Sequence, residues 1–274
     1  MLRMKSNRNV ISSFPNHLTR AVRLMALSAM LAAATAPADE RLFTYNYEAD
    51  VLPKGGKEFE QWVTLKRQKQ GRQFTRWDLR EEFEYGLTDK LTTALYANMR
   101  QVHDSSKLRQ NTFEFHGVSS EWKYQVLNPN DKPLGLLIYG EATGDDTFLE
   151  LEEKVVLQKN FGEKWVSVFN GTVEQEWKAG EHELALELSA GLAYKLTPHW
   201  ALGVEALNKR VFPEFASEKH SAYFVGPALH YGAAKWWATL TFLPQIAGRP
   251  ATNGGRDLDE FNRFEIRLIT GINF

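Results

Sequence analysis

The sequence predicts an all-β fold: a transmembrane up-and-down antiparallel β-barrel of about twelve strands over residues 57–274. Apolar residues recur at every second position in many segments, which is the spacing of a strand and not of a helix. The intervening positions are small, polar or charged, so one face of each strand suits hydrocarbon and the other suits water. The connections alternate between short and long, as expected of a barrel whose two ends face different compartments.

Residues 1–38 have the pattern of a cleaved signal peptide and are left out of the predicted fold. Five basic residues and no acidic residue precede an apolar run at 24–34, which is too short to span a membrane as a helix. Ala36-Pro37-Ala38 offers a cleavage site, and Ala34-Thr35-Ala36 is a second one. A membrane anchor that is never removed is the alternative. Residues 39–56 are then expected to form a short periplasmic N-terminal segment.

Composition narrows the class of protein. The chain contains no cysteine, so disulfide bonds do not hold it together. Without the basic residues of the signal peptide it is mildly acidic, and no nucleic-acid partner is expected. After residue 38 no apolar stretch approaches the 18 residues of a spanning helix. A closed sheet in lipid meets these limits, because it pairs every backbone group and leaves no edge.

The strands are predicted from the alternation. The clearest segment places apolar residues at every even position from Leu184 to Leu196, and the last strand repeats this pattern with Phe264, Ile266, Leu268, Ile272 and Phe274. Strong alternation also covers 77–87, 149–157, 165–177, 223–231 and 236–242. Weaker runs near 57–69, 90–102, 110–126, 133–143 and 200–210 complete a count of twelve. A soluble β-sandwich or lipocalin-like barrel also alternates, but it hides its apolar face inside.

Aromatic residues and connections define the two ends of the predicted barrel. Trp165 and Trp177 share one face of a strand and would lie roughly 30 Å apart along the membrane normal, at the heights of two aromatic girdles. The predicted girdle residues are Trp165, Trp177, Trp200, Tyr85, Tyr194 and Tyr231. Short turns are expected at 87–90, 161–164, 196–199 and 232–235, and longer loops at 102–110, 211–219 and 245–260. Glu81 and Glu153 fall on the lipid-facing parity, which this pattern does not explain.

The C-terminal strand resembles that of the outer-membrane β-barrels of Gram-negative bacteria. It ends in Leu268-Ile269-Thr270-Gly271-Ile272-Asn273-Phe274, and the turns at 86–90 and 195–200 are similar to periplasmic turns of that family. The resemblance implies an outer-membrane location, contact with lipid and lipopolysaccharide, and recognition by the barrel-assembly machinery, but no activity. The residues it assigns to the assembly signal are Phe264, Ile266, Leu268, Ile272 and Phe274.

Charged residues on the opposite parity predict what lines the lumen. The pore-lining candidates are Lys66, Asp78, Arg80, Glu82, Glu84, Arg100, Glu174, Glu176, Glu187, Lys195, Glu205, Arg263, Glu265 and Arg267. If basic and acidic groups form opposed arcs, they create a transverse field that orients polar solutes. If they pair across the lumen, they simply fill it. The sequence therefore predicts a narrow, porin-like channel for small polar or charged solutes, with a non-conducting structural or surface-binding barrel as the alternative.

An outer-membrane lipid hydrolase is the third hypothesis. Its candidates are His220 with Ser221, and His230 with Ser119 or Ser120, because a serine needs a nearby base to become a nucleophile. Adjacent residues on a strand point to opposite faces, so His220 and Ser221 cannot pair directly. No catalytic residues, cofactor or metal site are therefore expected. The acidic pair Asp145-Asp146 in an outer loop leaves calcium binding as an open alternative to simple solvation.

Overall fold

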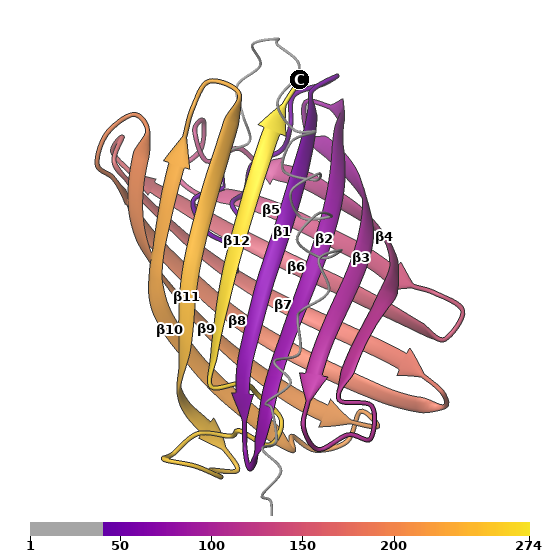
Figure 1. The fold of residues 1–274 in the computed structure, drawn as a ribbon. Helices are drawn as coiled ribbons and strands as arrows, with labels where there is room; N and C mark the ends of the chain where they lie inside the picture. Colours follow the sequence, from indigo (N-terminus) through magenta and orange to yellow (C-terminus); the bar gives the residue numbers. More distant parts are fainter. Residues whose placement is uncertain (1–40) are drawn as a thin grey trace, which may run out of the picture. The chain divides into compact units, whose positions relative to one another are not determined.

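The computed structural model describes residues 41–274, and these residues form one closed barrel of twelve antiparallel strands (Figure 1). The strands are β1 (Lys57–Lys69), β2 (Arg72–Thr88), β3 (Leu91–Asp104), β4 (Asn111–Leu127), β5 (Gly135–Gly144), β6 (Phe148–Phe161), β7 (Trp165–Lys178), β8 (Glu181–Lys195), β9 (Trp200–Pro213), β10 (His220–Gly232), β11 (Trp236–Arg249) and β12 (Phe264–Asn273). Each strand pairs with its neighbours in the sequence. The predicted all-β, up-and-down barrel is confirmed, whereas the predicted signal peptide lies outside the described residues.

The first and last strands close the barrel. β1 pairs with β12 in an unbroken register from Glu58 opposite Asn273 to Arg67 opposite Phe264. This pairing removes the free edges that an open sheet would expose. The five residues predicted as an assembly signal lie at alternate positions on the outer side of this closing strand or directly after it. Their recognition by assembly machinery stays a prediction.

The outer face of the barrel is apolar over most of its area. Large hydrophobic side chains such as Phe169, Leu188 and Leu240 are more than two-fifths exposed there. Glu81 and Glu153, the two acidic residues at lipid-facing positions of the pattern, do face outward. Glu81 lies directly across from Gln61, whose amide nitrogen donates a hydrogen bond to the Glu81 carboxylate at 2.9 Å. Gln61 on the neighbouring strand therefore provides the Glu81 carboxylate with a hydrogen bond. No β-bulge at this position turns the Glu81 side chain toward the lumen.

The two ends of the barrel differ in their connections. We call them the turn end, where β1 begins and β12 ends, and the loop end (Figure 1). Connections at the turn end are mostly short, including 89–90, 162–164 and 233–235, although 128–134 is longer. At the loop end the connections run from two residues at 70–71 to the long segment 250–263. Within residues 41–274, no helix is long and apolar enough to cross a membrane.

The aromatic residues predicted as girdles lie near strand ends. At the turn end, the Trp165 and Tyr194 ring centroids are 4.8 Å apart, and those of Trp200 and Tyr231 are 4.7 Å apart. At the loop end, Trp177 contacts Phe215 edge-on. Aromatic side chains thus border the apolar outer face at both ends. Their position at a membrane interface stays a prediction.

Candidate functional site

The described chain begins inside the barrel. Residues 41–53, which we call the N-terminal segment, belong to the stretch 39–56 that was expected to precede the barrel as a periplasmic segment. Instead they contact the inner faces of strands around the wall. Phe43 is fully buried, and its ring lies against Gly191 of β8 and Gly203 of β9. A Cβ at Gly191 would come within 2.9 Å of this ring, so glycine leaves the room in which the phenylalanine packs.

Polar side chains of the wall bind the backbone of the N-terminal segment. The Glu205 carboxylate accepts the backbone N–H groups of Thr44, Tyr45 and Asn46 at 2.8–3.0 Å. Asn170 accepts the N–H of Tyr47 at 2.7 Å and donates to its carbonyl at 3.1 Å. These bonds replace the water that the segment would otherwise need, because buried backbone donors and acceptors require partners.

Side chains of the wall also form hydrogen bonds with the backbone of Ala49 and Leu52, further along the N-terminal segment. Gln158 accepts the N–H of Ala49 at 2.7 Å, and Gln125 donates to the Ala49 carbonyl at 2.6 Å. Thr92 accepts the N–H of Leu52 at 2.9 Å. Side chains from β3, β4, β6, β7 and β9 therefore hold one extended stretch of chain across the lumen.

A buried core fills part of the lumen beside the segment. Tyr47 stacks edge-on with Tyr139 at 5.0 Å, and both belong to a cluster with Trp62, Trp237 and other buried side chains. The Arg41 guanidinium lies 4.0 Å above the Tyr47 ring and 4.5 Å from the Trp62 ring. Packed side chains thus fill the interior of the barrel around Tyr47 and Trp62.

Two chambers remain on either side of this filled region. The loop-end chamber has a volume of about 480 Å³ and is bordered by Thr44, Tyr45 and Tyr47 of the segment. The turn-end chamber has a volume of about 500 Å³ and is bordered by Leu42, residues 48–53 in part, and Lys195. The N-terminal segment borders both chambers, so it lies between them.

The loop-end chamber carries opposed arcs of charge. The basic arc comes from β1, β2 and β3 and consists of Lys66, Lys69, Arg76, Arg80 and Arg100. The acidic arc comes from β6, β7 and β8 and consists of Glu150, Glu152, Glu174, Glu176, Glu183 and Glu187. In the ring of twelve strands, β7 is the strand opposite β1. The two arcs therefore face each other across the chamber.

Ion pairs neutralise the basic arc in part and the acidic arc only at its edges. Asp78 contacts Arg76 at 2.7 Å and Arg100 at 2.8 Å. On the acidic side, Glu187 contacts Lys209 at 2.6 Å. Among the residues that the structure describes, Glu174 makes no ion pair, and neither do Glu150, Glu176 and Glu183. Where the acidic groups are ionised, this arrangement would give the chamber a field of defined direction.

The predicted lumen residues divide into several groups. Nine of them line the loop-end chamber: Lys66, Asp78, Arg80, Arg100, Glu174, Glu176, Glu187, Glu265 and Arg267. Lys195 lines the turn-end chamber, while Glu205 binds the N-terminal segment. Glu82 and Glu84 are buried beside Glu60. Arg263 precedes β12 and is exposed, so it borders neither chamber.

The candidate hydrolase residues are not brought together. Ser119 hydrogen-bonds to Asn98 and Thr143 on its own side of the barrel, and Ser120 accepts from Trp122. His220 contacts the Asp257 carboxylate at 2.6 Å rather than a serine. Neither Ser119 nor Ser120 forms a hydrogen bond with His230, so the geometry of these pairs lacks the contact that serine activation needs.

The family of the chain follows from comparison with known sequences. The model of a family of unknown function (DUF6662) matches residues 35–274. The chain belongs to this family. No curated protein matches the sequence significantly.

Two solved structures with a similar fold are an outer-membrane channel and a porin. The COG4313 outer membrane channel from Pseudomonas putida F1 is 12% identical with a TM-score of 0.63, and the match covers 88% of this chain and 100% of that one. A NanC porin is 10% identical with a TM-score of 0.53, covering 79% of this chain and 100% of that one. At this identity the likeness concerns the fold alone.

Proposed function

We propose that this DUF6662 protein is a narrow outer-membrane channel for small charged or polar solutes, constricted by its own N-terminal segment. The observation that carries the proposal is the loop-end chamber with its opposed arcs of charge. A solute with a charged group, or with separated charges, would be oriented as it enters such a field.

The contrast between the two parts of the lumen supports a role in solute passage. Around Tyr47 and Trp62, the barrel fills its interior with aromatic and aliphatic side chains. At the loop end it instead keeps an open volume lined by charges, including acidic groups without ion-pair partners. Unpaired charges add little stability compared with an apolar filling of the same space. Because these acidic groups lie next to an open volume, we infer that they contact a charged solute and do not serve only to stabilise the barrel.

The proposed location rests on the outer surface. A closed sheet with an apolar outer face is one of the two structures that span a bilayer without unpaired backbone groups. The fold shared with the COG4313 channel and the NanC porin agrees with it. Export by a cleaved signal at residues 1–38, and contact with lipopolysaccharide and the assembly machinery, belong to the same proposal.

Single-channel conductance of the refolded protein in a planar bilayer tests the proposal, with heat-modifiable gel mobility as the check on folding. The expected result is small, steady, ion-selective steps, because the N-terminal segment narrows the lumen. A folded protein that never conducts would contradict the channel.

That second outcome would favour the non-conducting structural or surface-binding barrel. The non-conducting barrel is supported by the many hydrogen bonds between the wall and the N-terminal segment, because they would hold the segment in the lumen permanently. Conductance separates the two candidates because only the channel admits ions.

A further inference from the structure

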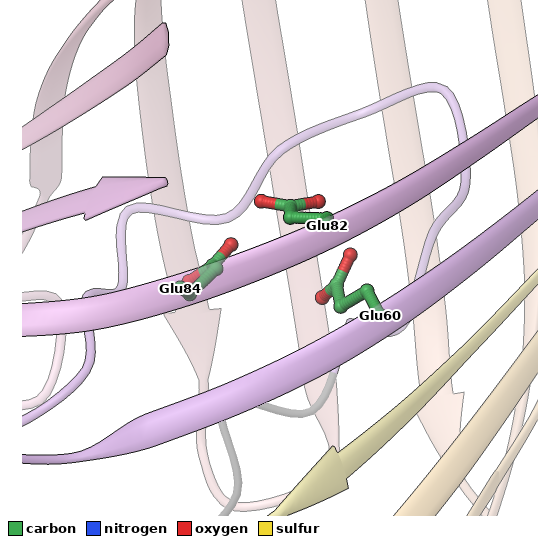
Figure 2. A group of neighbouring side chains, drawn as sticks. All are labelled: Glu60, Glu82 and Glu84. Atoms are coloured by element: carbon green, nitrogen blue, oxygen red, sulfur yellow. The ribbon is translucent and has the colours of Figure 1, made fainter. Parts of the chain in front are cut away.

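Three glutamates form a buried group where β1 and β2 lie side by side. Glu60 of β1 and Glu82 of β2 are direct cross-strand partners, and Glu84 follows on the same face (Figure 2). Each is at most 1% exposed. One carboxylate oxygen of each lies within 4.8 Å of the others. We call this group the glutamate triad.

Within residues 41–274, the central member of the triad has no hydrogen-bond donor outside the triad. Glu60 accepts a hydrogen bond from Trp62 Nε1 at 2.7 Å, and Glu84 contacts Lys123 Nζ at 2.5 Å. Both carboxylate oxygens of Glu82 are buried, and within residues 41–274 no N–H or hydroxyl group donates a hydrogen bond to them. Figure 2 shows the three side chains close together, Glu82 and Glu84 on one strand and Glu60 on its neighbour. Such a group is costly to bury unless a cation or a proton joins it.

The cations next to the triad are too few to balance it. Arg41 Nη1 lies 3.8 Å from Glu60. Lys123 contacts Glu84 and also Glu121, at 3.4 Å. The triad and Glu121 thus bring four carboxylates to two positive side chains. Negative charge therefore remains at the triad, and a bound cation would reduce it.

We propose that the glutamate triad binds one divalent cation, for which Ca²⁺ is the best match. Calcium takes oxygen ligands at about 2.3–2.6 Å in flexible geometry, so it can bridge oxygens separated by the distances found here. Mg²⁺ demands shorter, octahedral coordination and retains several waters, which suits a buried pocket less well. The bound ion would tie β1 to β2 beside Arg41 and so stabilise the docked start of the N-terminal segment.

Calcium uptake and thermal unfolding of the folded protein in detergent test the proposal after treatment with EDTA. Wild-type protein is expected to take up one Ca²⁺ per chain and to unfold at a higher temperature with Ca²⁺ than without it, because a ligand that binds only the folded state stabilises it. Glu82→Gln should lose both the uptake and the thermal response. Without calcium it should be at least as stable as wild type, because it no longer buries an unpaired charge.

The matched control is Asp146→Asn in the exposed loop between β5 and β6, which removes one acidic charge outside the triad. This variant should keep the uptake of the wild type. If Asp146→Asn abolishes uptake, or if Glu82→Gln takes up as much Ca²⁺ as wild type, the ion binds elsewhere and the proposal is wrong. Absence of uptake by wild-type protein would also overturn it, and the triad would then hold protons.

A luminescence experiment gives a readout that does not depend on the folding of Glu82→Gln. Trp62 donates to Glu60, so it lies close enough to excite a lanthanide bound at the triad. Tb³⁺ added to wild-type protein should show tryptophan-sensitised emission that Ca²⁺ displaces and that Trp62→Phe weakens. Emission that Ca²⁺ does not displace would contradict a calcium site.

Discussion

Loss of the Glu205 carboxylate should release the first part of the N-terminal segment. In the structure this side chain accepts three consecutive backbone N–H groups, from Thr44 to Asn46, at 2.8–3.0 Å. Hydrogen bonds to a charged group contribute about 1.5–3 kcal/mol each, and neighbouring bonds are not additive. For Glu205→Ala we therefore expect docking of this stretch to weaken by about 3 kcal/mol or more, or about a hundredfold in the released population.

Hydrogen–deuterium exchange in detergent measures this release directly. The amides of residues 44–46 should exchange about a hundredfold faster in Glu205→Ala than in wild type. The amide of Ala49 should stay protected, because Gln158 still accepts it. Channel conductance should rise in parallel, while heat-modifiable mobility shows that the barrel persists. If protection at 44–46 and conductance both match the wild type, Glu205 does not anchor the segment and the reasoning fails.

Three further changes probe the packing. Phe43→Ala removes a fully buried ring and should cost the docked segment about 3–5 kcal/mol, seen as faster exchange at residues 42–46 without loss of the barrel; unchanged exchange would contradict the packing role. Gly271→Ala should lower barrel stability by about 1–3 kcal/mol in urea unfolding, because the added Cβ would collide with Glu58 and Trp237, and an unchanged midpoint would refute the collision. Gln61→Leu leaves outward-facing Glu81 without its donor and should destabilise the barrel by about 1–3 kcal/mol in the same assay, and an unchanged midpoint would refute the contribution of this hydrogen bond.

The sequence carried enough information to predict the barrel because a strand in a barrel has two unlike faces. Every second residue must suit hydrocarbon, so the segment from Leu184 to Leu196 reveals both its strand and its direction. The same parity placed Asp78, Arg100 and Glu174 on the inner face. Parity placed Arg263 less well, because β12 begins only at Phe264 and the alternation no longer applies before it.

The position of the N-terminal segment could not be predicted in this way. An extended stretch that bonds to side chains, and not to a neighbouring strand, has no periodic pattern, so residues 41–53 resemble a linker. The inward-facing residues of the strands did indicate such a partner. Asn170, Gln158 and Thr92 are neutral hydrogen-bonding residues at inward positions, and such side chains suit a backbone partner better than an ion pathway. Glu205 was predicted as a lumen charge, but its partners are backbone amides.

The glutamate triad illustrates a second limit. Alternation placed Glu82 and Glu84 on the inner face, but it did not bring Glu60 beside them. The register of β1 against β2, which sets Glu60 opposite Glu82, depends on the turn at 70–71 and on the register shift between Arg67 and Lys69, and alternation within either strand does not give it. A one-residue shift in that register would have separated these carboxylates.

Ion selectivity tests the central claim, that solutes pass through the charged loop-end chamber. The measurement is the reversal potential across a planar bilayer under a salt gradient, for wild type and for the double variant Glu174→Gln, Glu176→Gln. Both residues lie in the acidic arc, and neither makes an ion pair within residues 41–274. Their neutralisation should shift the reversal potential toward anion preference, while Asp146→Asn leaves it unchanged. The claim is contradicted if the protein conducts but the double variant has the reversal potential of the wild type. It is also contradicted if Asp146→Asn shifts the reversal potential by the same amount.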